Sequence, residues 1–286
     1  MKIKYRDLLE KKSNNRKAVL VTAYDYSTAS VIEKCRIDIV LVGDSASMTM
    51  LGNRSTLEIT LDEMITFSKG VRKAIKSPYM IVDMPFMSYQ PSKRDAIKNC
   101  GRVMKETRCD AVKMEGGREL IDRIKAVIDS GIPVCGHIGM KPQSYKKYGG
   151  YPVMGFNEEE AIQIIMDGET LEKAGVEMII IENTVDLVTK YLKENLRIPV
   201  YSIGSGTQSD GQIVVLNDIL GLYSDFTPRF IDRYAQLSKV IEDAVNRYSD
   251  DVVKSKFPKK KKIPRMAKAN FMKMLEKLEA VKQNKR

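Results

Sequence analysis

The sequence predicts an α/β protein, folded as a (β/α)8 TIM barrel with a basic, helical C-terminal extension. Short continuous apolar runs recur along the chain, and segments with helical spacing of apolar residues separate them. The excess of positive charge is confined to residues 254–286. A repeated strand-helix pattern of this length is typical of a closed parallel barrel, and an open doubly wound sheet is the alternative.

The apolar runs predict buried parallel strands, because strands covered on both faces carry continuous rather than alternating apolar residues. Seven such runs occupy 19–23, 37–42, 79–82, 111–114, 133–135, 178–181 and 199–203. An eighth strand is expected within 213–222. Between them, spacing such as that of Leu120, Ile124 and Val127 predicts amphipathic helices.

Charge divides the chain into two predicted regions, a catalytic barrel over 1–253 and an extension over 254–286. The net charge of +11 arises in the extension, which holds 13 basic and two acidic side chains, whereas 1–253 is balanced at 35 of each. The 286 residues suffice to bury about three-quarters of the unfolded surface without disulfides. The four cysteines form no CxxC pair, the first residues are charged, and no apolar run approaches the ~20 residues of a membrane helix, so a cytoplasmic protein is expected.

The extension permits a reading of a different class, namely binding of an anionic surface or nucleic acid. It contains a lysine run, Lys259–Lys262, and a helical apolar stripe formed by Ala267, Phe271, Met274, Leu275, Leu278 and Val281. Such a stripe more often packs on its own or a neighbouring subunit, so nucleic-acid binding is the less favoured reading.

Two glycine-containing segments follow predicted strands. Gly204-Ser205-Gly206 could bind an anion through its main-chain N–H groups or could form a simple tight turn. The segment 141–156 is too long for a minimal connection and is expected to be a mobile loop over the barrel mouth. GxGxxG and GxxxxGK[ST] are absent, so dinucleotide and P-loop chemistry have no basis here.

Polar residues, most of them acidic, stand where the predicted strands end, and in a barrel the chemistry is located at these C-terminal ends. They are Asp25, Asp44, Ser45, Asp83, Lys113, Glu115, His137 and Glu182. Any one of them could instead cap a helix or form a turn. Their number in one chain favours a functional site.

Asp44, Asp83 and Glu115 are predicted to be magnesium ligands. They lie 39 and 32 residues apart, close to one strand-helix unit each, so they fall on successive strands. Carboxylate oxygens suit Mg²⁺, whereas zinc is disfavoured by a single histidine and poorly spaced cysteines. Salt bridges to Lys113 and other basic groups are the structural alternative.

Three further residues have both a chemical and a structural interpretation. Lys113 could neutralise a developing enolate or simply offset the acidic cluster. Glu182 ends an apolar run, where desolvation would raise its pKa and suit it as a general base, or hydrogen bonds could hold it structurally. His137 could lie near the substrate or be a structural histidine. With a metal, these groups suit proton abstraction beside the carbonyl of an α-keto acid.

Seven motifs in order show that residues 1–250 resemble ketopantoate hydroxymethyltransferase, the 3-methyl-2-oxobutanoate hydroxymethyltransferase of pantothenate and coenzyme A synthesis. They are VTAYDYSTA (21–29), LVGDSASMT (41–49), STLEITLDEM (55–64), VDMPFMSY (82–89), VKMEGG (112–117), PVCGHIGMKPQS (133–144) and IGSGTQSDGQIVVLND (203–218).

The resemblance implies roles for the same residues. Asp44, Asp83 and Glu115 match the magnesium ligands. Asp44, Ser45, Asp83 and Lys113 match residues that bind the keto acid, and Glu182 matches the proton acceptor. The implied reaction deprotonates 3-methyl-2-oxobutanoate at C3 and transfers a hydroxymethyl group from 5,10-methylenetetrahydrofolate, in a cytoplasmic homodecamer of barrels.

The sequence departs from the family pattern around the outer pocket, at Ala46, Ser47, Met154, Phe156 and Asn217. None of these positions is a predicted metal ligand or the predicted base. A magnesium-dependent carbon–carbon lyase or mutase of the phosphoenolpyruvate mutase and isocitrate lyase type is the alternative enzyme, since those barrels also bind a keto acid through magnesium.

Overall fold

The computed structural model describes residues 2–223, 228–259 and 262–284. Contacts divide the chain into two compact units, Met1–Ala235 and Gln236–Arg286. The first unit is a closed parallel barrel with strand order β1 to β8, which confirms the predicted fold class and excludes the open sheet. Lys260 and Lys261 of the predicted lysine run lie outside the described residues.

Each strand pairs in parallel with the next, and β8 pairs with β1 to close the barrel. The strands are β1 (Ala18–Thr22), β2 (Ile39–Val42), β3 (Tyr79–Asp83), β4 (Ala111–Glu115), β5 (Val134–Gly139), β6 (Met178–Glu182), β7 (Val200–Ile203) and β8 (Gly211–Val214). The eighth strand is shorter than the apolar run that predicted it, since the chain turns into the helix α10 (Leu216–Ile219). A buried strand and a buried helix carry similar apolar runs, so hydrophobicity alone does not separate them.

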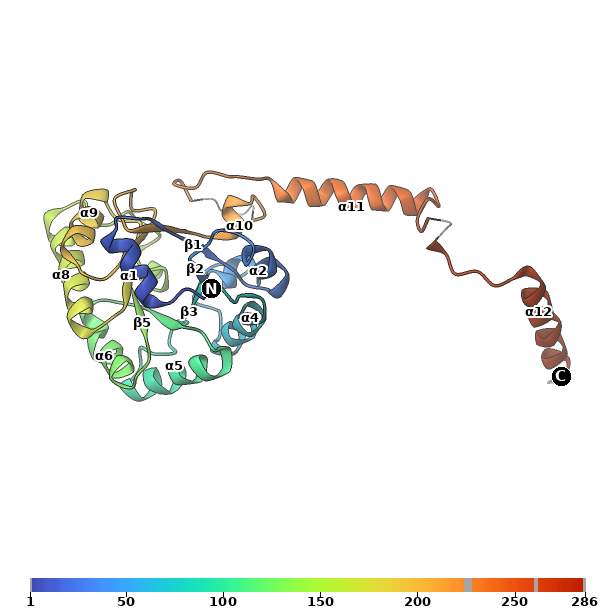
Figure 1. Cartoon of the computed structure of the whole chain (residues 1–286), viewed down its shortest axis with the longest axis horizontal. Helices are drawn as coiled ribbons and strands as arrows, with labels where there is room; N and C mark the ends of the chain where they lie inside the picture. Colours follow the sequence, from blue (N-terminus) through green and yellow to red (C-terminus); the bar gives the residue numbers. More distant parts are fainter. Residues whose placement is uncertain (1, 224–227, 260–261, 285–286) are drawn as a thin grey trace. The chain divides into compact units, whose positions relative to one another are not determined.

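Helices surround the strands in the first unit, as Figure 1 shows. They are α1 (Tyr5–Ser13), α2 (Tyr26–Ile32), α3 (Ala46–Thr49), α4 (Leu61–Ala74), α5 (Lys93–Thr107), α6 (Ile121–Asp129), α7 (Tyr145–Tyr148), α8 (Glu158–Ala174), α9 (Asp186–Asn195) and α10, with 3₁₀ turns η1 (Arg118–Leu120) and η2 (Pro142–Ser144). Side-chain caps start several of them. Thr60 and Glu63 form a reciprocal capping box on α4, and Asn157 caps α8.

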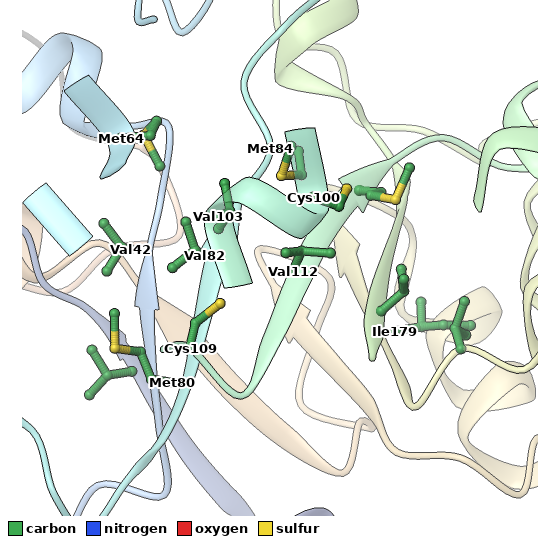
Figure 2. Close-up of a cluster of buried hydrophobic side chains, with 14 of the residues drawn as sticks. Val42, Met64, Met80, Val82, Met84, Cys100, Val103, Cys109, Val112 and Ile179 are labelled. Atoms are coloured by element: carbon green, nitrogen blue, oxygen red, sulfur yellow. The ribbon is translucent and has the colours of Figure 1, made fainter. Parts of the chain in front are cut away.

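Two layers of apolar side chains form the core. The outer layer lies between the strands and the helices, and Figure 2 shows part of it, with Val82 and Val112 on strands facing Val103 on α5. The inner layer fills the barrel and includes Leu20, Ile81 and Ile180. Fully burying side chains of this size stabilises the fold by about 1.5–3 kcal/mol each.

Acidic residues stand immediately before all four even-numbered strands, at the end of the barrel opposite the predicted site. They are Asp38, Asp110, Glu177 and Asp210. Each of the three aspartates accepts a main-chain N–H of the preceding strand at 2.9 Å, from Val19, Met80 and Val200 respectively. Lysines of the N-terminal segment, Lys11, Lys2 and Lys12, pair with the same carboxylates. The N-terminal segment and helix α1, which also inserts Leu8 into the inner layer, therefore close this end.

The second unit contains α11 (Leu237–Val253) and α12 (Lys268–Gln283), and neither helix has a buried residue. The division at residue 235 places α11 with α12, whereas the predicted boundary at residue 253 follows α11. No helix in the described part of the chain is long and apolar enough to cross a membrane.

Candidate active site

Strand alternation directs the predicted site residues into the barrel. Successive side chains on a strand point to opposite faces, so residues two apart share a face. Tyr79 and Ile81 lie in the inner apolar layer, and Asp83 is the next residue on that face. The same alternation from Ala111, Cys135 and Ile180 brings Lys113, Glu115, His137 and Glu182 to the same end of the barrel.

Asp25, which also follows a strand, has a different position. Its Oδ1 accepts the main-chain N–H of Thr28 at 2.9 Å and caps α2. The capping interpretation is therefore confirmed for this aspartate, and it is not part of the site.

Asp44, Asp83 and Lys113 form a buried charged group. Lys113 Nζ lies 2.8 Å from Asp83 Oδ1 and forms an ion pair with this carboxylate. Asp83 Oδ2 accepts the main-chain N–H of Asp44 at 3.0 Å. A side chain at Gly43 would come within 2.8 Å of Ser45 Oγ and 3.5 Å of Asp83 Oδ2. Glycine at this position thus leaves room for the Ser45 hydroxyl.

Charge and burial oppose each other in this group. Burial, together with the charge of Asp83, raises the pKa of Asp44 to about 7. Burial alone would lower the pKa of Lys113, but the nearby carboxylates of Asp83, Asp44 and Glu115 outweigh it and raise the pKa. Lys113 is therefore a charged ammonium surrounded by carboxyl groups, which is suited to binding an anionic oxygen of a substrate.

Gln143 connects Asp44 with Glu115 and was not expected from the sequence. Its Nε2 donates to Asp44 Oδ2 at 2.9 Å, and its main-chain N–H donates to Glu115 Oε1 at 2.9 Å. Glu115 is 5% exposed, and burial followed by the charge of Asp44 raises its pKa well above the usual range. Gln143 lies in the connection after β5, where no strand periodicity signals the direction of a side chain.

His137 lies between Glu115 and Glu182. Its Nδ1 is 3.4 Å from Glu115 Oε2 and 3.3 Å from Lys113 Nζ, and its Nε2 is 3.2 Å from Glu182 Oε2. Burial, and next the charge of Lys113, lowers the pKa of His137 well below its usual value, so the ring is neutral. An ammonium can only donate, so Nδ1 accepts from Lys113 and the ring proton is on Nε2, facing Glu182.

The carboxyl group of Glu182 is largely buried but remains partly exposed to solvent. Burial, and more weakly the charges of Asp44 and Asp83, raises its pKa to about 8 despite the opposing effect of Lys113. Its side chain is still 19% exposed, more than those of Asp44, Asp83, Lys113, Glu115 and His137. A carboxyl group in this environment can exchange a proton with a bound molecule near neutral pH.

Ser45 is held by a buried tyrosine. Its Oγ lies 2.7 Å from the hydroxyl of Tyr24, whose pKa burial raises to about 12. Ser45 immediately precedes the short helix α3, which begins with two positions that depart from the family pattern. Ala46 and Ser47 are both buried, and Ser47 Oγ donates to the main-chain oxygen of Ser55 at 2.6 Å.

The two glycine-containing segments are both structured. Ser205 Oγ accepts the N–H of Thr184 at 2.9 Å, which gives the 204–206 turn a role in joining the β6 and β7 ends. In the segment predicted as a loop, η2 and α7 form, and Tyr145 stacks on Tyr151 with ring centroids 5.5 Å apart. Burial, then the charges of Tyr145, Glu182 and Asp44, raises the pKa of Tyr151 to about 12.

The carboxylates suit magnesium by their chemistry. Within the described residues, no three His, Cys, Asp or Glu side chains are arranged as a ready metal-binding group. Lys113 pairs with Asp83 instead, and Gln143 holds Asp44 and Glu115. However, hard oxygen ligands are those that Mg²⁺ prefers. The charge of a cation would offset the desolvation and the repulsion by Asp83 that raise the pKa of Asp44. The ligand assignment therefore remains a prediction.

The fold and the site together define a class of protein: a (β/α)8 barrel enzyme with carboxyl groups, a neutral histidine and a charged lysine buried at the C-terminal ends of its strands. Comparison with known proteins identifies the family. The ketopantoate hydroxymethyltransferase family matches residues 2–260, and the chain belongs to this family. It is accordingly a hydroxymethyltransferase, a type of transferase.

Named relatives agree with this assignment. The chain is 47% identical over 257 residues to the 3-methyl-2-oxobutanoate hydroxymethyltransferase of Chlorobaculum tepidum, covering 88% of this chain and 93% of that protein. It is 44% identical to the enzyme of the same name from Phocaeicola vulgatus, covering 90% and 94%.

Solved structures with the same fold are more distant. A phosphonopyruvate hydrolase in complex with oxalate and Mg²⁺ matches with a TM-score of 0.58 at 11% identity, covering 98% of each chain. A 2,3-dimethylmalate lyase matches with a TM-score of 0.52 at 13% identity, covering 99% of this chain and 98% of that one. At such identities the likeness concerns the fold alone. The lyase or mutase alternative therefore fits less well than the family assignment.

Proposed function

We propose that the chain catalyses hydroxymethyl transfer from 5,10-methylenetetrahydrofolate to 3-methyl-2-oxobutanoate, giving ketopantoate and tetrahydrofolate, with water supplying the hydroxyl oxygen. Family membership and the names of the relatives support the reaction. The structural observation that carries it is the placement of Glu182 at the end of a buried chain of contacts from Lys113 through His137.

In this proposal Asp44, Asp83 and Glu115 would hold Mg²⁺, which would supply Lewis-acid chemistry toward the keto acid. Lys113 and Ser45 bind the oxygens of the keto acid, together with Asp44 and Asp83. The charge of Lys113 stabilises the negative charge that develops when the substrate loses its C3 proton. His137 is proposed to lie close to the substrate.

Glu182 takes the C3 proton on its carboxylate. Burial raises its pKa to about 8, so it is a stronger base than an ordinary carboxylate and still ionises near neutral pH. The electron pair of the broken C–H bond then forms the new C–C bond to the one-carbon unit. Over the whole reaction both C–N bonds of the methylene bridge break and water forms the new C–O bond. The C3 proton and one proton of the water replace the carbon on the two tetrahydrofolate nitrogens.

The proposal extends to the setting of the enzyme, which we place in the cytoplasm as a homo-oligomer, a decamer by family resemblance. The barrel is proposed to be the catalytic part and residues 254–286 an accessory extension. The departures at Met154 and Phe156 fall in the segment beside the site, and Phe156 is 78% exposed, so it is open to contact with the folate.

The test separates the first half-reaction from the transfer. Purified protein with Mg²⁺ and 3-methyl-2-oxobutanoate in D₂O is expected to exchange the C3 proton, followed by ¹H NMR, and to form ketopantoate once methylenetetrahydrofolate is added. Glu182→Gln is expected to retain keto-acid binding and lose exchange by at least ~10²-fold. Absence of both exchange and ketopantoate in the wild-type protein would overturn the proposal.

A further inference from the structure

Gln143 is a buried amide, 6% exposed, at the centre of the hydrogen bonds around the predicted magnesium carboxylates. It lies in η2, directly before α7 and the segment that leads to α8. Its side chain and its main chain contact two different carboxylates, Asp44 and Glu115, which come from different parts of the barrel.

A neighbouring carbonyl group shows that the Gln143 amide is the donor in its hydrogen bond with Asp44. Gln143 Nε2 lies 3.0 Å from the main-chain oxygen of Met84 and 2.9 Å from Asp44 Oδ2. A carbonyl oxygen can only accept, so the atom between Met84 and Asp44 is the amide nitrogen. The nitrogen therefore donates one proton to each.

The other side of the amide is also fixed. Gln143 Oε1 lies 3.0 Å from Gln90 Nε2 and 3.1 Å from the hydroxyl of Tyr89. Tyr89 in turn accepts the main-chain N–H of Glu115 at 3.0 Å. The Tyr89 hydroxyl also lies 2.8 Å from the main-chain oxygen of Glu115, and its single proton can go to only one of these two oxygens at a time. Both protons of the Gln143 amide and at least one lone pair of its oxygen thus have partners, so the side chain cannot rotate without breaking contacts on both sides.

We infer that Gln143 is a positioning residue that orients Asp44 through its side chain and Glu115 through its main-chain N–H for binding of the divalent cation. This inference rests on the proposed function. Groups that hydrogen-bond metal ligands fix the ligand orientation, and their loss typically weakens metal affinity by about 10–100-fold. Because Gln143 lies near the start of the 141–156 segment, the same contacts tie that segment to the two carboxylates.

The test is Gln143→Met, which has nearly the same shape but no amide. We expect Mn²⁺ binding, measured by electron paramagnetic resonance, and the Mg²⁺ activation constant of C3 proton exchange both to weaken by about 10–100-fold. The exchange rate at saturating Mg²⁺ is expected to change much less than the activation constant, a split that a general loss of structure would not produce.

Two further variants complete the test. Gln143→Asn keeps an amide, but its side chain is too short to reach Asp44, so it is also expected to weaken Mn²⁺ binding. It serves as the test if Gln143→Met does not fold. Gln163→Met is the matched control, since Gln163 is an exposed residue of α8 whose amide contacts Arg118. Its cation affinity is expected to be unchanged.

Cation affinity within about twofold of wild type in a folded Gln143 variant would overturn the inference, since a twofold change is well below the expected loss of affinity. Failure of the proposed function is a different result. Wild-type protein that binds Mn²⁺ but does not exchange the C3 proton refutes the reaction and still allows Gln143 to be judged from binding. Wild-type protein without divalent-cation affinity refutes both.

Discussion

His137 presents its Nε2 to Glu182 Oε2 at 3.2 Å, while its Nδ1 accepts from Lys113 on the other side of the ring. Because the ring is buried and neutral, it links the charged lysine to the proposed base without carrying charge itself.

This contact predicts different effects for two amide replacements of His137. Glutamine can place its amide nitrogen near the position of Nε2, whereas asparagine reaches only the position of Nδ1. His137→Gln is therefore expected to retain more C3 proton exchange than His137→Asn, which should lose about 10²-fold or more. Exchange rates at saturating Mg²⁺ measure the difference, and equal loss in both variants would contradict the proposed orientation.

Removal of the predicted magnesium ligands is expected to abolish metal-dependent turnover. Asp83→Ala and Glu115→Ala should each lower the rate by at least about 10²-fold and weaken Mg²⁺ binding, measured by calorimetry. Asp122→Ala is the control, because Asp122 lies on α6 with its side chain 66% exposed. Retained magnesium affinity in the first two variants would refute the ligand assignment.

The raised pKa values predict how stability depends on pH without a divalent cation. The folded-state pKa of Asp44 is raised to about 7 and that of Glu182 to about 8, above their ordinary values of 3.8 and 4.5. The folded state then holds protons that the unfolded state has released, so stability falls as the pH rises from about 4 to 8.

Thermal unfolding followed by circular dichroism tests this dependence. The Tm is expected to fall by several degrees between pH 5 and pH 8. Mg²⁺ should raise the Tm more at pH 8 than at pH 5, since a cation stabilises the ionised carboxylates. A Tm that rises over this interval without Mg²⁺ would show that these groups are not buried as protonated acids.

The part of the C-terminal extension that follows residue 260 is expected to be dispensable for chemistry. Residues 261–286 lie beyond the family match, and α12 has no buried residue. A chain ending at residue 260 should keep its turnover within about twofold, because no proposed site residue lies in the segment. Gel filtration would show any change in assembly. A loss of turnover would instead assign the extension a part in the active enzyme.

Most of the fold was predictable because apolar strand-like runs alternate with helix-like segments at regular intervals along the chain. Continuous apolar runs mark strands that are buried on two faces, and the closed barrel confirms seven of them in order. The eighth run was less informative, since only Ile213 and Val214 of it belong to β8 before the chain enters α10. The site residues on strands were equally predictable, because alternation fixes the face of Asp83, Lys113 and Glu115 once the strand is known.

The sequence by itself determined the barrel, the family resemblance, and the acidic, basic and cationic residues at the strand ends. Only the tertiary structure separated Asp25, a helix cap, from Asp44, which lies in the site, although both follow a strand. It alone revealed Gln143, Tyr24 and the direction of the His137 contacts. The physical reason is that a strand gives each side chain a direction, whereas the connections after strands have no repeating geometry.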